Sequence, residues 1–127
     1  DHIVVGQWTA ETFRRTEEIA ALYTVAVPRS LAQKLEMRQI HFVPDEAIAL
    51  TVDVSSVWET KLSAMRCHAT QVSSSPMMSA PEERRRLFFG QEHFVRAACR
   101  NPERDFMADV LKEKLLERSE NDVDRKI

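Results

Sequence analysis

Two residue types that often mark ligand sites are scarce in this sequence. Its 127 residues include only two glycines, Gly6 and Gly90. Loops that hold nucleotide phosphates need several glycines at fixed spacing, so the GxGxxG and GxxxxGKS patterns are absent. The two cysteines, Cys67 and Cys99, lie far apart and lack CxxC spacing. This arrangement favours buried free thiols over a disulfide or a zinc knuckle.

An excess of one charge and a long apolar run are missing as well. The sequence has 18 basic and 20 acidic residues and a formal net charge of −2, a balance that does not favour nucleic acid as a partner. The longest apolar stretch, near residues 20–27, is far too short to cross a bilayer, so we expect no membrane span. Reduced cysteines fit a cytoplasmic location. Hydrophobic residues make up 43% and charged residues 30%, which is typical of a globular domain.

The spacing of apolar residues predicts helices that alternate with two short buried strands. The strands are expected over residues 22–27 and 49–55. The helices are expected over residues 1–20, 29–38, 57–71 and 81–99, with a break possible at Gly90, and over a final stretch from residue 105 that frays into a charged tail. A loop over residues 72–81 could act as a lid. Strands separated by helices favour an α/β fold with parallel strands. Because two strands cannot form a covered sheet alone, the rest of the sheet is expected upstream of this chain.

Side chains at helical spacing identify a candidate core. On the helix predicted over residues 57–71, the core stripe consists of Trp58, Leu62, Met65 and Ala69. The adjacent stripe consists of Val57, Lys61, Ala64 and His68, which places His68 at the edge of the buried face. The aromatic residues Trp8, Phe88, Phe89 and Phe94 are also expected in the core.

The chain opens with an acid and a histidine, Asp1 and His2, where a helix is expected to begin. Asp1 can serve as the N-cap of that helix, and His2 alone would be an ordinary solvent-exposed histidine. The same pair is also common in metal sites, where a carboxylate fixes the tautomer of a neighbouring histidine. His41 and His93 have no partner at the spacing of metal ligands.

Three blocks of the sequence together resemble one enzyme family. The blocks are "DHIVVGQ", "YTVAVPRSLAQKL" and "VDVSSVWETKLSAMRCHATQ", and "FGQEHF" adds a fourth, shorter match. The third block is the most specific, with Lys61, Ala64, His68, Thr70 and Gln71 at the expected spacing. Over residues 1–96 the chain resembles the carboxyl-terminal portion of the PIG-L/LmbE-like N-acetylglucosaminyl deacetylases.

This resemblance implies a Rossmann-like three-layer α/β fold with a mostly parallel sheet. The chain would be an incomplete, carboxyl-terminal part of one such domain, with residues 119–127 as a frayed charged tail. The implied activity is zinc-dependent removal of acetyl from a small-molecule acetamido sugar or sugar conjugate. A zinc ion with three protein ligands and an open position lowers the pKa of its bound water to roughly 7 and stabilises the oxyanion.

The resemblance also implies site residues. His2 would be a zinc ligand, and Asp1 would orient a histidine that lies before this chain. The other zinc ligands and the general base would also lie upstream, so the segment alone is expected to be inactive. For His68 two interpretations stay open: a helix-end histidine near the helix dipole, or a contact to the substrate.

A second interpretation belongs to a different class of protein. The chain could be a non-catalytic α/β binding or assembly module with a degenerate site, and the charged stretch Lys112–Arg118 could then contact another subunit of a homo-oligomer. The sequence leaves open which acyl sugar is bound, the oligomeric state, and whether the segment folds or binds metal without its upstream half.

Overall fold

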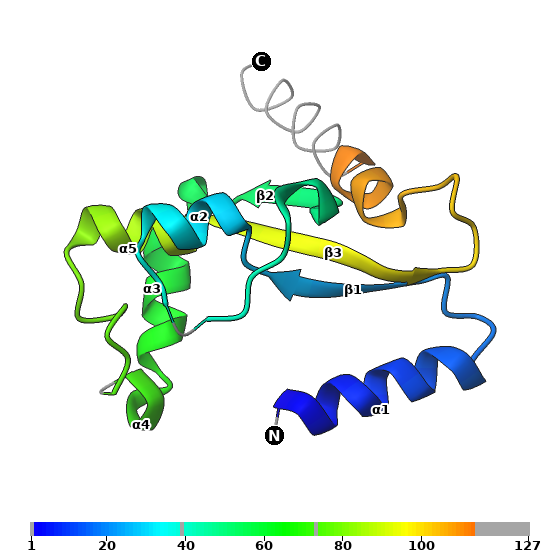
Figure 1. The fold of residues 1–127 in the computed structure, drawn as a ribbon, viewed down its shortest axis with the longest axis horizontal. Coiled ribbons are helices and arrows are strands. Elements are labelled where there is room, and N and C mark those ends of the chain that lie inside the picture. The colour runs from blue at the N-terminus through cyan, green and yellow to red at the C-terminus, as the bar shows by residue number, and fades with distance from the viewer. Residues whose placement is uncertain (1, 39, 73, 114–127) are drawn as a thin grey trace, which may run out of the picture. The chain divides into compact units, whose positions relative to one another are not determined.

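The computed structural model describes residues 2–38, 40–72 and 74–113. Its helices and strands are α1 (His2–Arg15), β1 (Ala21–Ala26), α2 (Arg29–Lys34), β2 (Leu50–Asp53), α3 (Trp58–Arg66), α4 (Ala69–Val72), α5 (Glu82–Phe89) and β3 (Gln91–Cys99) (Figure 1). Short 3-10 turns cover Asp45–Ala47 and Ser55–Val57. A last helical stretch begins at residue 106. The predicted tail 119–127, Asp1 and most of Lys112–Arg118 lie outside the described residues.

The strands form one sheet in the order β1-β3-β2. Strands β2 and β3 are antiparallel, with Leu50 opposite Phe94 and Asp53 opposite Gln91. The Arg100 amide, just past β3, donates to the Ala20 carbonyl, just before β1, at 3.0 Å. Strand β3 therefore runs opposite to both of its neighbours, and β1 and β2 point the same way (Figure 1). A larger, mostly parallel sheet stays a prediction for a longer protein.

The sequence prediction was wrong about residues 91–99, which form strand β3 and not the second half of a helix. Helix α5 ends at Gly90, whose amide donates to the Arg86 carbonyl at 2.8 Å. A Cβ at Gly90 would collide with that same carbonyl oxygen, so only glycine fits there. The following residues include Phe94 and Val95, which favour a strand, and β2 supplies the backbone partners.

The chain divides into two compact units, residues 1–24 with 96–127, and residues 25–95. In the second unit the buried apolar side chains include those of Ala32, Leu35, Trp58 and Leu62. Trp58 and Leu62 confirm the first half of the predicted stripe on α3. Its second half was wrong: Met65 is half-buried and Ala69 exposed, because α3 stops at Arg66 and a separate short helix follows.

The phenylalanines predicted for the core are only half-buried. Phe88 and Phe89 make an edge-to-face contact, with ring centroids 4.8 Å apart. Phe94 lies on β3 opposite Leu50. All three are of intermediate exposure, since the described residues cover only part of each ring.

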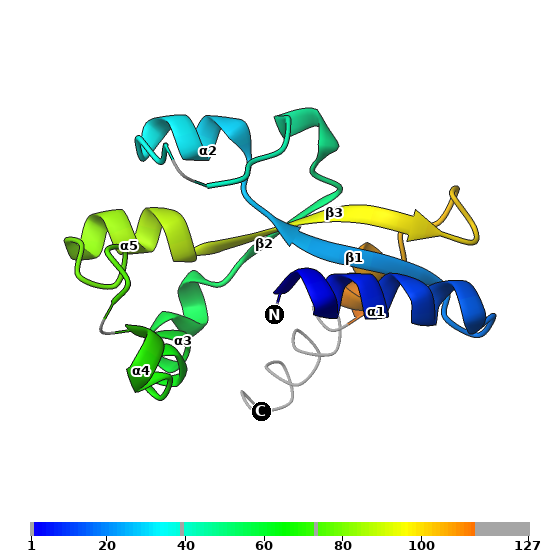
Figure 2. The same cartoon turned by 60° about the horizontal axis from the view of Figure 1, so that its bottom comes forward.

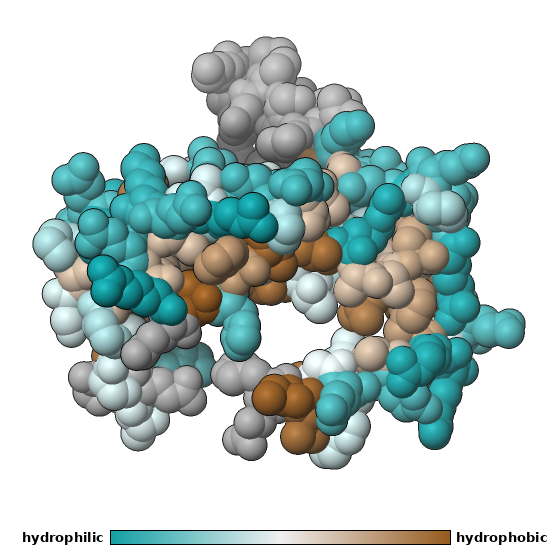
Figure 3. Space-filling model, viewed as in Figure 1, coloured by the Kyte–Doolittle hydropathy of each residue, from teal (hydrophilic) through white to brown (hydrophobic). Residues whose placement is uncertain are grey.

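In the first unit, α1 leaves much of its apolar surface uncovered. Ile3 is 79% exposed and Trp8 is 70% exposed, so the prediction of Trp8 as a core residue was wrong. Figure 3 shows hydrophobic surface over the amino-terminal part of α1. On this helix, Val5, Trp8 and Thr12 line one shallow groove of about 290 Å³ together with Leu22.

Two further sequence predictions concern the cysteines and the membrane. Both cysteines are free, as predicted, but Cys67 is exposed and Cys99 half-buried, so the expected burial was wrong. Cys67 directly follows the last turn of α3, where its side chain points outward. Across the described part of the chain, no helix has the length and apolar character needed to cross a membrane.

Candidate functional site

The Asp1–His2 pair, which the sequence singles out, lies at the limit of what the structure describes. His2 is the first residue of α1, and neither its side chain nor Asp1 is among the described groups. Their roles as zinc ligand and orienting carboxylate therefore stay predictions. His2 belongs to the first compact unit and His68 to the second.

His68 lies at the break between α3 and α4. Its amide donates to the Met65 carbonyl at 3.1 Å, and its carbonyl accepts from the Val72 amide at 3.0 Å. Its side chain is exposed and not at the edge of the buried face, because the end of α3 turns it toward solvent. An exposed imidazole is accessible to a ligand, and a substrate contact stays a prediction. Gln71, from the same block, has no described side chain.

A zinc site needs three or four converging donors. Among residues 2–38, 40–72 and 74–113 the structure contains no group of three histidine, cysteine, aspartate or glutamate residues placed to hold a metal ion. The described residues alone therefore do not fit a zinc site, and any site built on His2 needs donors from outside them.

Lys61, a basic residue of the third sequence block, has a side chain that is held by two polar contacts. It extends from α3, is only 19% exposed, and places Nζ 2.9 Å from Glu92 Oε1. The same ammonium group donates to the Phe89 carbonyl at 2.6 Å. Lys61 thus ties α3 to the junction between α5 and β3. These two contacts give Lys61 a structural role.

The Lys61–Glu92 pair lines a cavity of about 310 Å³ in the second unit. Its walls are mostly apolar and include Leu31, Met65 and Phe88. His93 also lines it, and its Nδ1 lies 2.9 Å from Thr51 Oγ1 on β2. Burial lowers the pKa of His93, and the Asp45 carboxylate opposes that shift. The polar groups of this cavity make contacts within the fold.

Two arginines of α5, Arg84 and Arg86, make specific contacts within the fold. Arg84 donates to the Leu35 carbonyl at the end of α2. Arg86 pairs with Glu82 at 2.7 Å and stacks over the Trp58 ring at 4.8 Å. Both arginines are therefore engaged within the fold.

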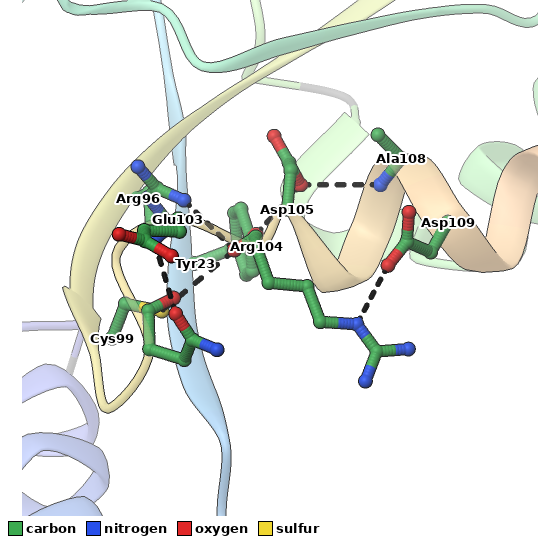
Figure 4. Close-up of polar contacts among 9 residues, drawn as sticks. Tyr23, Arg96, Cys99, Glu103, Arg104, Asp105, Ala108 and Asp109 are labelled. Atoms are coloured by element: carbon green, nitrogen blue, oxygen red, sulfur yellow. Dashed lines mark hydrogen bonds and ion pairs between the residues drawn. The ribbon is translucent and has the colours of Figure 1, made fainter.

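The first unit has its own polar cluster, which sequence analysis did not find (Figure 4). The Tyr23 hydroxyl on β1 donates to Asp105 Oδ1 at 2.7 Å, and the same oxygen accepts from the Ala108 amide at 3.1 Å. Asp105 therefore caps the helical stretch that begins at residue 106. An aspartate directly before a helix is a cap signal in the sequence, but its partner 82 positions earlier leaves no local signal.

The electrostatics of this pair follow from its hydrogen bonds. The Tyr23 hydroxyl, and next the Ala108 amide, lower the pKa of Asp105. Burial, and next the Asp105 carboxylate, raise the pKa of Tyr23. Nearby, Arg96 donates to the Arg104 carbonyl at 3.0 Å and the Cys99 thiol to the Asn101 carbonyl at 2.8 Å. The cluster fixes the turn between β3 and the last helical stretch.

Comparison with known proteins gives one informative match. The chain is similar to the 1D-myo-inositol 2-acetamido-2-deoxy-alpha-D-glucopyranoside deacetylase of Acidothermus cellulolyticus, with 28% identity over 115 residues. The match covers 75% of this chain and 39% of that protein, so the chain spans about two fifths of the relative's length. No protein-family model matches the chain, and no solved structure matches it.

Proposed function

We propose that this chain is part of a hydrolase that removes acetyl from the amino group of an acetamido sugar or sugar conjugate. The observation that carries the proposal is the 28% identity to a deacetylase whose name specifies a 2-acetamido-2-deoxy-glucopyranoside joined to inositol. The ordered sequence blocks, ending with the VDVS-to-HATQ stretch, support the same family of PIG-L/LmbE-like deacetylases.

We further propose that the activity depends on zinc and that His2 is one of its ligands. The described residues do not form a zinc site, so the proposal assigns the other donors to parts of a longer protein. Asp1, next to His2, would be the carboxylate that orients a neighbouring histidine. His68, exposed between α3 and α4, would contact the substrate and would not bind the metal.

The test uses the full gene product that contains this chain. Release of a free amine is measured with N-acetylglucosaminyl-inositol and with N-acetylglucosamine as probes, and bound zinc is measured by elemental analysis. His2→Ala is expected to lower the zinc content and to reduce kcat/KM by more than about 100-fold. His41→Ala is the matched control, because His41 is an exposed histidine in a loop and should change neither quantity.

The His68 proposal has a separate readout. His68→Ala should raise KM several-fold and leave the zinc content unchanged. A zinc-loaded protein that turns over neither probe would contradict the enzyme and favour the non-catalytic module. Full activity in the His2→Ala protein would overturn the ligand assignment.

A further inference from the structure

A cavity of about 720 Å³, which we call the α2–α5 cavity, lies within the second unit. It is formed by the residues that follow α2, by the loop between α4 and α5, and by α5 itself. Figures 1 and 2 agree that α2 and α5 lie side by side, with the chain from α4 leading into α5. Sites for small molecules in proteins have volumes of roughly 300–1,000 Å³, so the cavity has the size of a ligand site.

The walls of the α2–α5 cavity are mostly apolar. Met37 and Met77 line it from two of the segments, and Phe88 and Phe89 line it from α5. All four side chains are half-buried, so the described fold leaves part of their apolar surface open. Buried Leu35 also lines the cavity. Because thioether side chains adapt to irregular shapes, these walls suit the apolar body of a ligand.

Hydrogen bonds within the loop hold one wall of the cavity in place. The Ser75 amide donates to the Val72 carbonyl and the Met78 amide to the Ser75 carbonyl, both at 3.1 Å. The Ala80 amide donates to the Met77 carbonyl at 3.2 Å. These successive turns fix the backbone around Met77 without a ligand, which lowers the entropic cost of binding. A lid role for this loop stays a prediction.

Two arginines make the lining of the cavity positively charged. The Arg84 guanidinium donates to the Leu35 carbonyl, which places it at the end of α2, close in sequence to Arg38. Within the described part of the chain, neither arginine forms an ion pair. Glu36 also lines the cavity and opposes only one of the two charges. The charge that complements this lining is therefore negative.

We propose that the α2–α5 cavity binds a small amphiphilic carboxylate. Its apolar chain lies against Met37, Met77 and the rings of α5, and its carboxylate binds Arg38 and Arg84. Guanidinium groups bind carboxylates through charge-assisted hydrogen bonds, which are stronger than those between neutral groups. An apolar cavity with a few polar groups that fix the orientation of the ligand is typical of small-molecule sites. The proposal goes beyond the deacetylase activity and does not rest on it.

The experiment measures binding to the full gene product by isothermal titration calorimetry. The probes are decanoate and decanamide, which have the same chain length and differ in charge. We expect the Kd of decanoate to be at least about tenfold lower than that of decanamide. Arg38→Gln should raise the Kd of decanoate at least about tenfold. Arg66→Gln is the matched control, because Arg66 is an exposed arginine at the end of α3, and it should leave the Kd unchanged.

Methyl NMR of labelled methionines locates the bound probe. Decanoate should shift the methyl signals of Met37 and Met77 and leave that of Met107, in the first unit, unchanged. Circular dichroism checks that Arg38→Gln is folded.

Three results would overturn the proposal. The first is the absence of decanoate binding at about 1 mM, as expected if another part of the polypeptide fills the cavity. The second is equal affinity for decanoate and decanamide, or an unchanged Kd in Arg38→Gln, which would exclude recognition of the carboxylate. The third is a set of shifts that leaves out Met37 and Met77. Because binding requires no turnover, each result is independent of whether the protein is a deacetylase.

Discussion

The two compact units differ in how they are held together. The buried hydrophobic residues Ala32, Leu35, Trp58 and Leu62 all belong to residues 25–95. The first unit instead contains the most exposed large apolar residue, Ile3, at 79%. The second unit is one continuous stretch of the sequence, whereas the first joins the two ends of the chain. The buried hydrophobic residues thus lie in the continuous unit, whereas polar contacts join the two ends of the chain in the first unit.

Those distant contacts involve few residues. The Arg100 guanidinium donates to the carbonyls of Phe13, Thr16 and Ile19, at 2.6–3.0 Å, and stacks over the Phe13 ring. The Tyr23–Asp105 hydrogen bond connects β1 to the last helical stretch. Hydrogen bonds of this kind contribute about 1 kcal/mol each, less than a buried aromatic side chain.

The largest difference in the free energy of unfolding is expected between alanine variants of the two tryptophans. Trp58→Ala removes a side chain that is only 2% exposed and should lower the free energy of unfolding by about 3–5 kcal/mol. Trp8→Ala, at 70% exposure, should cost less than about 1 kcal/mol. Urea unfolding followed by far-UV circular dichroism measures both.

A milder variant keeps this comparison measurable if Trp58→Ala fails to fold. Trp58→Phe retains most of the buried surface, and the indole Nε1 has no hydrogen-bond partner among the described residues. Trp58→Phe should therefore lower the free energy of unfolding by less than half as much as Trp58→Ala. If Trp58→Ala and Trp8→Ala lowered the free energy of unfolding by the same amount, the proposed difference in packing between the two units would be refuted.

An intermediate effect is expected at Lys61. Lys61→Met removes the ion pair with Glu92 and the hydrogen bond to the Phe89 carbonyl, and should cost about 1–3 kcal/mol, because the group is largely buried. Glu11→Gln is the control in the first unit, where Glu11 pairs with Arg14 on the exposed face of α1. It should give no measurable change in a thermal melt at physiological salt. The comparison between the units fails if the Glu11 variant is the more destabilised.

The smallest effect is expected at Tyr23. Tyr23→Phe should cost about 1 kcal/mol or less at pH 7, because the pair with Asp105 is partly exposed. The pKa of Asp105 is lowered in the folded protein, so its contribution is present above the unfolded-state pKa and is lost as the pH falls through the folded-state pKa. The difference between wild type and variant should therefore shrink below about pH 4. Urea titrations at pH 7 and pH 3 measure it, and a constant difference would show that ionised Asp105 is not the partner.

Sequence patterns predicted the elements that depend on the spacing of apolar residues close together in the sequence. Strand β1 and the Trp58–Leu62 stripe on α3 lie where apolar spacing predicted them, and α1 lies within its predicted range but ends at Arg15 and not near residue 20. Strand β3 was missed, because charged residues before Gly90 favoured a helix that was extended too far. The Tyr23–Asp105 contact could not be predicted, since hydrogen bonds across 82 positions leave no periodic trace. Within the candidate site, the exposure of His68 follows from where α3 ends, which spacing alone does not fix.

The position of Arg100 in the sequence determines when α1 gains its contacts to this residue during synthesis. Its three carbonyl partners lie 81 to 87 positions earlier. During synthesis α1 leaves the ribosome some eighty residues before Arg100, and it lacks this anchor until Arg100 has been translated. Its exposed valines, isoleucine and tryptophan are open to chaperones throughout that interval. Slower translation between α1 and Arg100 would lengthen this exposure, and the first unit is completed only after the second has emerged.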